Sequence, residues 1–89
     1  MNHTHTLTLA VRPSHGALVR VLGLAERRGY PPHGVHARMD PEEQRMFIEL
    51  HVPIDNRPLE QLVRQLNKLP DVLALHTHPP HTLSQSAHG

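Results

Sequence analysis

The feature that most constrains this fold is the order in which the spacing of apolar residues changes along the chain. Residues 6–11 alternate between apolar and polar side chains, which is the period of a half-buried strand. A helical period follows, with apolar residues three and four positions apart at Leu18, Val21, Leu22 and Ala25. We expect the Ser14 hydroxyl to cap this helix and Gly29 to end it as a left-handed stop.

The second half of the chain repeats this change of period. Residues 35–40 and 46–52 alternate as strands, and the turn residues 40–43 between them predict a hairpin with a loop of about four residues. A second apolar helical stripe then runs through Leu59, Leu62, Val63, Leu66 and Leu69. Helix-start residues precede it at 55–58, and a short strand over 72–77 follows it.

The resulting order of elements is strand, helix, strand, strand, helix, strand. Two right-handed crossovers place both helices on one face of a four-stranded antiparallel sheet, so we expect an α+β, ferredoxin-like sandwich. The boundaries that we predict are a flexible N-terminus over 1–5, a folded domain over 6–77 and a disordered polar tail over 78–89. The helical stripes predict core packing rather than a binding surface, because the sheet needs covering.

Composition excludes several functions. A net charge of +1 gives no electrostatic case for nucleic acid or an anionic membrane surface. Only Phe47 could stack on a base from the sheet, so the fold order does not point to RNA binding. The absence of cysteine excludes disulfides and suits the cytoplasm, and the start of the chain lacks the pattern of a signal peptide.

Two groups of residues have the side chains of a metal site or a catalytic site, but their spacing favours neither kind of site. Histidines cluster near both ends, including His76 and His78, but a metal site needs three or four convergent ligands held by structure, so we expect no metal. Ser14, His15 and Asp40 have the residue types of a catalytic triad, but sequence neighbours rarely face each other in one. We therefore expect no catalytic residue.

Two segments carry a family resemblance. Residues 14–30 resemble the ACT-domain pattern, in which a Gly (Gly16) opens the first helix, an Arg-Val pair follows and Arg-Gly-Tyr ends it. Residues 62–72 are similar to the second ACT helix of acetolactate synthase small subunits, where Gln-Leu-Asn-Lys-Leu leads into an Asp-Val strand start. The match is closest to the short small subunit of the isozyme II type, which is a lone ACT domain.

This resemblance implies a non-catalytic regulatory subunit. Such a subunit binds and activates the acetolactate synthase catalytic subunit in valine, leucine and isoleucine biosynthesis. The resemblance places thiamine diphosphate, Mg²⁺ and FAD on that catalytic partner and no cofactor on this chain. A free-standing sensor, which binds a small amino acid at the interface of an ACT dimer, is the alternative.

The resemblance also implies where such an amino acid would bind. The ligand residues would be Ser14, His15, Gly16, Ala17 and Leu18 of one protomer and Val35 of its neighbour. Gly16 lets a ligand approach the backbone, although it could equally serve only the turn into the helix. Valine-sensitive members carry Asn where this chain has Pro13 and Pro31, and Pro offers neither a polar side chain nor an amide proton. We therefore expect activation without a strong response to valine.

The second predicted strand is an edge of the sheet in this topology. Its unpaired backbone groups offer a route to self-pairing, so we expect a homodimer. The predicted dimer edge consists of Val35, His36, Ala37, Arg38 and Met39. The outer sheet face, or the loop that opens the first helix, would then meet the catalytic subunit.

Overall fold

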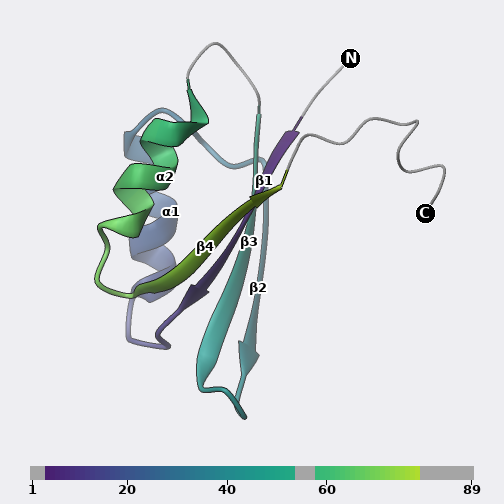
Figure 1. Cartoon of the computed structure of the whole chain (residues 1–89), viewed down its shortest axis with the longest axis vertical. Helices are drawn as coiled ribbons and strands as arrows, with labels where there is room; N and C mark the ends of the chain where they lie inside the picture. Colours follow the sequence, from purple (N-terminus) through teal and green to yellow (C-terminus); the bar gives the residue numbers. More distant parts are fainter. Residues whose placement is uncertain (1–3, 54–57, 79–89) are drawn as a thin grey trace, which may run out of the picture.

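A computed structural model describes residues 4–53 and 58–78 of the chain. The elements in chain order are β1 (Thr4–Val11), α1 (Ala17–Arg27), β2 (Gly34–Asp40), β3 (Arg45–Pro53), α2 (Leu59–Asn67) and β4 (Val72–His78). Both helices lie on one side of the sheet, and the β2–β3 hairpin extends beyond them (Figure 1). The predicted order and layering are confirmed.

The strand order across the sheet is β2-β3-β1-β4, with antiparallel pairing throughout. β1 lies between β3 and β4, so the first strand of the chain is at the centre of the sheet. β2 is an edge strand, as predicted, and β4 forms the other edge. Within residues 4–53 and 58–78, both edges leave one row of backbone groups without a strand partner.

The strand ends differ from the prediction in two places. Thr4 and His5, which we expected in a flexible N-terminus, lie in β1 and pair with Pro53 and Val52 of β3. His78, which we expected in the polar tail, lies in β4 opposite Thr6. Ladder hydrogen bonds come from the backbone, so strands continue past the alternating side chains that predicted them. Residues 1–3, the expected helix start at 55–57, and residues 79–89 of the predicted tail lie outside the described residues.

The two ends of α1 are built differently. Its C-terminal stop is as predicted: Gly29 has φ of +87°, its N–H donates to Glu26 O at 3.0 Å, and Tyr30 N–H donates to Ala25 O at 2.8 Å. This is the Schellman arrangement, which satisfies carbonyls at the end of the helix. The predicted Ser14 cap is wrong, because the N-cap is Gly16 and no side chain caps the helix. The Ser14 hydroxyl instead donates to the Asp71 carboxylate, a stronger acceptor.

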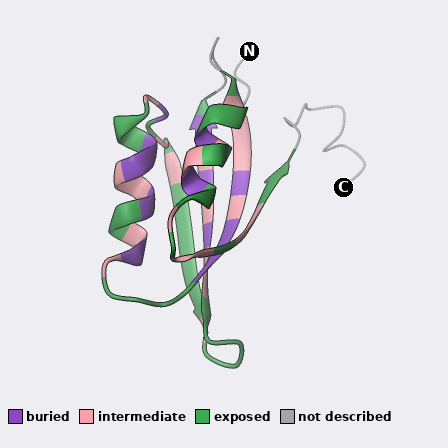
Figure 2. Ribbon diagram, turned by 60° about the vertical axis from the view of Figure 1, so that its left-hand side comes forward, coloured by how far each residue is buried: buried purple, intermediate pink, exposed green. Residues whose placement is uncertain are grey.

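The core lies between the sheet and the helices (Figure 2). Its fully buried aliphatic side chains come from β1, β3 and both helices, namely Leu7, Leu9, Val11, Val21, Ile48, Leu50, Val52, Leu62 and Leu66. Each such side chain contributes roughly 1.5–3 kcal/mol relative to an exposed one. Leu62 and Leu66 are buried, and Leu59, Val63 and Leu69 pack against the same cluster, which confirms that the α2 stripe forms core.

Candidate functional site: the loop before α1 and the edge strand β2

The loop between β1 and α1 is held by a charged side chain, Asp71, which lies much later in the sequence. Ser14 Oγ donates to Asp71 Oδ1 at 2.9 Å, and Arg20 Nε donates to Asp71 Oδ2 at 2.8 Å. Arg20 Nη2 also donates to Ser14 Oγ at 3.0 Å, which closes a triangle of contacts. We call Ser14, Arg20 and Asp71 the Asp71 clamp. It ties the loop to the turn between α2 and β4.

The clamp has an electrostatic consequence for Asp71. The Arg20 and Ser14 hydrogen bonds lower the pKa of the Asp71 carboxyl below its ordinary value, because both stabilise the charged form. The Asp71 backbone takes part as well, since its carbonyl accepts from Arg12 N at 2.8 Å. Sequence reasoning missed this cluster because Ser14 and Asp71 are separated by 57 positions. No local pattern links residues so far apart.

Gly16, the predicted close-approach residue, has a conformational reason to be glycine. Its φ is +81°, a left-handed conformation that costs other residues about 1–2 kcal/mol. A Cβ on Gly16 would also lie 3.1 Å from Arg20 Nη1, so a side chain there would press on the clamp. Both observations account for the glycine without requiring a ligand.

The other predicted ligand residues of the loop have different surroundings. His15 is exposed, Leu18 is half-buried and packs on the core, and Ala17 is buried. The Ala17 N–H donates to Ser14 O at 3.1 Å, so this amide is already engaged. A ligand at the loop would have to use the remaining groups around Gly16.

Val35, the sixth predicted ligand residue, does not lie beside this loop within one protomer. Val35 pairs with Leu50, which pairs with Leu7, whereas the loop follows Val11 at the end of β1. Along β1, the row that contains Leu7 and Val35 lies four residues, or roughly 13 Å, from Val11. Across the sheet, β3 lies between β2 and β1. The structure therefore does not bring Val35 to the loop within one protomer, and the predicted site would take Val35 from a second copy.

The edge strand β2 exposes an apolar row on the same side of the sheet as the helices. Val35 is 44% exposed and Met39 is 51% exposed, and Ala37 between them is exposed too. Figure 2 shows β2 exposed along nearly its whole length. On the opposite side, the Arg38 guanidinium lies 4.7 Å from the centre of the Phe47 ring. The two helices cover the central strands and leave this edge open.

The open face of the sheet carries most of the structured histidines. His51 Nε2 lies 2.8 Å from Glu49 Oε2, and His51 Nδ1 is 3.3 Å from Thr6 Oγ1. His76 and His78 lie on β4. Within residues 4–53 and 58–78, no group of three His, Asp or Glu side chains is placed to hold a metal ion.

The suggested catalytic grouping is not assembled either. Asp40 Oδ1 accepts from the backbone N–H groups of Glu42 and Glu43 in the β2–β3 turn. The Ser14 hydroxyl is engaged in the Asp71 clamp instead. Ser14 and Asp40 therefore take part in separate structural hydrogen bonds, one to Asp71 and one within the β2–β3 turn.

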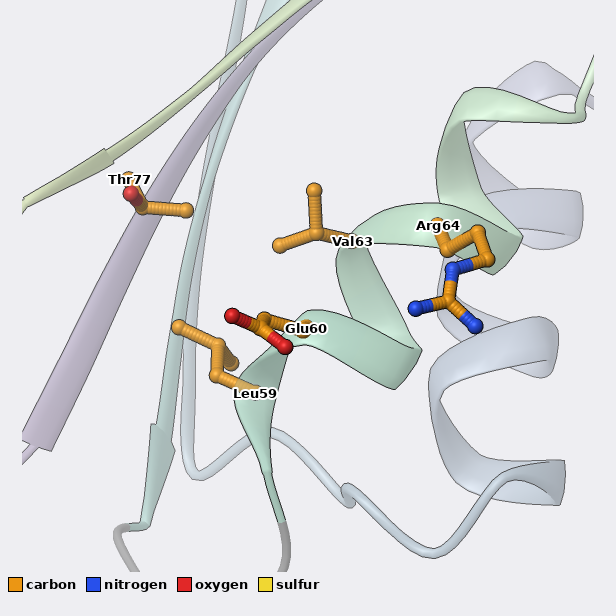
Figure 3. A pocket seen from close by; sticks show the side chains of 5 residues that line it. All are labelled: Leu59, Glu60, Val63, Arg64 and Thr77. Carbon is orange, nitrogen blue, oxygen red and sulfur yellow. The ribbon is translucent and has the colours of Figure 1, made fainter.

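A hollow of about 380 Å³ opens away from these predicted sites, between α2 and the end of β4. Its lining residues are Leu59, Glu60, Val63, Arg64 and Thr77. In Figure 3 the Glu60 carboxylate points toward β4, whereas the Arg64 guanidinium points toward α1. Sequence reasoning missed this hollow because Leu59 and Val63 have the spacing of core residues and are only half-buried.

The described part of the chain contains no helix that is long and apolar enough to span a membrane.

The sequence is similar to known proteins over most of its length. The family model described as "ACT domain" matches residues 13–75. The acetolactate synthase small subunits of Mycolicibacterium smegmatis and Mycobacterium bovis are 33% and 35% identical over 72 residues, which is 81% of this chain. A probable acetolactate synthase small subunit of Archaeoglobus fulgidus is 32% identical over 65 residues, or 73% of this chain. The chain spans only 41–43% of the length of these relatives.

Solved structures support the same fold at low sequence identity. The ACT domain from the GTP pyrophosphokinase of Chlorobium tepidum has a TM-score of 0.72 at 11% identity, over 88% of this chain and 100% of that one. An uncharacterized Thermotoga maritima protein has a TM-score of 0.70 at 21% identity, over 92% of this chain and 100% of that one. With its βαββαβ order and a family match over most of its length, the chain belongs to the ACT domain family.

Proposed function

We propose that this chain is a non-catalytic regulatory subunit that binds and activates an acetolactate synthase catalytic subunit. The observation that carries the proposal is 32–35% identity, across most of the chain, to relatives named acetolactate synthase small subunit. The pathway would be the biosynthesis of valine, leucine and isoleucine in the cytoplasm. The catalytic partner would hold thiamine diphosphate, Mg²⁺ and FAD.

The second part of the proposal is a homodimer that forms through β2. The exposed apolar row of Val35, Ala37 and Met39 would meet its copy while the backbone edges pair. Such pairing joins two four-stranded sheets into one and covers apolar surface that the helices leave open. It also supplies the second copy that the predicted ligand site would need.

An amino-acid effector would then bind between the loop at Ser14–Leu18 and the partner's Val35. Pro13 and Pro31 remove polar groups that Asn supplies in valine-sensitive members, and the Ala17 amide is engaged. These features favour an activator with a weak effector response over a free-standing sensor. A thermal-shift screen with valine, leucine and isoleucine separates the two, because a bound ligand stabilises the native state by mass action. The activator proposal predicts no saturable shift with any of the three.

The contact with the catalytic subunit is proposed at the start of α1. Val19 is 72% exposed, an apolar side chain in the first turns of the helix, beside the clamped loop. The open sheet face is the other surface that could meet the partner. Arg38 lies on this face, over the Phe47 ring. A substitution on each surface distinguishes them.

Co-elution with the catalytic subunit of the same organism tests the proposal. We expect a stable complex with the wild-type chain, loss of the complex with Val19→Asp, and retention with Arg38→Gln. Each variant must keep the wild-type thermal unfolding midpoint. No complex with the wild-type chain would overturn the proposed function, whereas loss only with Arg38→Gln would move the contact to the sheet face.

A further inference from the structure

A second hollow lies between the C-terminal end of α1 and the exposed side of α2. It has a volume of about 250 Å³ and is lined by Arg28, Gln61, Arg64 and Gln65. All four lining side chains are polar, two are cations and none is a carboxylate. We propose that this hollow binds a phosphate group, either as inorganic phosphate or as a phosphate monoester.

The two arginines that line the hollow come from different elements, because Arg64 lies on α2 and Arg28 is the C-cap of α1. Arg28 Nη2 donates to Gln65 Oε1 at 3.2 Å, which holds the Arg28 side chain against α2. Figure 3 shows Arg64 pointing toward α1, while Glu60, one turn earlier on α2, points the other way toward β4. The acidic neighbour on α2 is therefore directed out of the hollow.

No carboxylate in the described part of the chain forms an ion pair with either cation of this hollow. Among the described residues, the ion pairs join Arg20 to Asp71, Arg45 to Glu43 and His51 to Glu49. Neither Arg28 nor Arg64 is in an ion pair within that part of the chain. The C-terminus of α1 adds only about half a negative charge near Arg28, so the two full positive charges dominate.

A phosphate group matches this arrangement better than a carboxylate does. Two guanidinium groups offer forked N–H donors, which fit the oxygens of a phosphate in bidentate pairs. A phosphate dianion balances both charges, whereas a single carboxylate would leave one of them unpaired. The Gln61 and Gln65 carboxamides can supply further N–H donors around the same group.

The hollow is separate from the surfaces that the proposed function uses. It lies between the two helices, whereas the proposed dimer edge is β2 and the proposed effector loop precedes α1. A phosphate could therefore bind to the dimer without competing for either surface. The site would let a phosphate compound regulate the domain independently of amino-acid binding.

Titration of the full chain with inorganic phosphate, followed by NMR or calorimetry at constant ionic strength, tests the proposal. We expect saturable binding that Arg28→Gln and Arg64→Gln each weaken roughly tenfold or more. Arg27→Gln is the matched control and should bind like the wild type, because Arg27 Nη1 lies beside Gly23, back along α1. Glycerol phosphate in a parallel titration distinguishes the source: tighter binding than inorganic phosphate indicates a monoester, and equal binding indicates the free ion.

Three results would overturn the phosphate site. The first is the absence of saturable binding up to roughly 10 mM phosphate, a range in which even weak sites fill. The second is equal weakening by Arg27→Gln and Arg28→Gln, which would show attraction to general surface charge. The third is equal affinity for acetate, because a dianion is expected to pair with both arginines and acetate carries a single charge.

Discussion

At the scale of single residues, the Asp71 clamp joins the loop before α1 to the turn between α2 and β4. Its carboxylate receives hydrogen bonds from Ser14 and Arg20, which come from the loop and from α1. Because folding lowers the pKa of Asp71, the charged form stabilises the folded state. This contribution is present above the unfolded value, near 3.8, and is lost as the pH falls through the lower folded value.

Asp71→Asn tests this linkage. We expect the variant to be less stable than the wild type at pH 7 and to show a shallower loss of stability below about pH 4. Urea unfolding at several pH values between 7 and 2.5 measures both effects. Glu42→Gln, in the exposed turn, is the control and should keep the wild-type acid slope. An unchanged slope in Asp71→Asn would contradict the role of the clamp.

Two glycines of the same region should respond to alanine with opposite signs. Gly16→Ala forces a left-handed conformation on a residue with a Cβ and presses on Arg20, so we expect a loss of about 1–2 kcal/mol. Gly23→Ala, inside α1, should gain about 0.5–1 kcal/mol through helix propensity, because its new neighbour is only the flexible end of Arg27. Thermal or urea unfolding gives both values. A neutral Gly16→Ala would show that the left-handed turn is not required.

What could be predicted at this scale depended on sequence distance. The Gly29 stop was predictable because the two backbone hydrogen bonds that form it join near neighbours in the sequence, Gly29 to Glu26 and Tyr30 to Ala25. The Ser14 cap failed because the competing acceptor, Asp71, becomes a neighbour only after the fold has formed.

At the scale of elements, the helices divide into buried stripes and exposed margins. Leu66 on α2 is fully buried, whereas Leu59 at the start of the same helix is half-buried beside the hollow. We expect Leu66→Ala to cost about 2–5 kcal/mol, through lost transfer energy and a cavity, and Leu59→Ala to cost clearly less. Urea unfolding measures the difference. Equal losses would contradict the assignment of Leu66 to the core and Leu59 to its margin.

The types of all six elements could be read from the spacing of apolar residues, because each spacing is a local property. The ends of the strands could not be predicted in this way. Thr4 and His5 belong to β1 because they pair with β3, and not because their side chains alternate between apolar and polar. The hollow beside Leu59 and Thr77 was also hidden, because it depends on how far β4 lies from α2.

At the scale of the whole molecule, the two sheet edges are not equivalent in the proposed assembly. Val35→Lys with Met39→Lys places charges on the apolar row of β2, and we expect this double variant to be monomeric, because charged edges resist pairing. Leu73→Lys, on the opposite edge strand β4, is the matched control and should stay dimeric. Light scattering after size-exclusion chromatography reports the mass. Dissociation by Leu73→Lys alone would place the interface on β4.

The fold of this domain can be predicted from its own residues, whereas the identity of its proposed partner cannot. The ferredoxin-like layering was predictable because two amphipathic helices have one way to cover a four-stranded sheet. The proposed catalytic partner is another chain, so this sequence cannot describe it. The proposed ligand site also needs a second copy, because Val35 and the loop at Gly16 lie apart within one protomer.

The most direct test of a regulatory role is the rate of acetolactate formation from pyruvate by the catalytic subunit, measured as this chain is added. We predict no activity from this chain alone and a rate that rises and then levels off near a fixed molar ratio. A rate unaffected by any amount of the wild-type chain, under conditions where the chain is folded, would contradict the regulatory role.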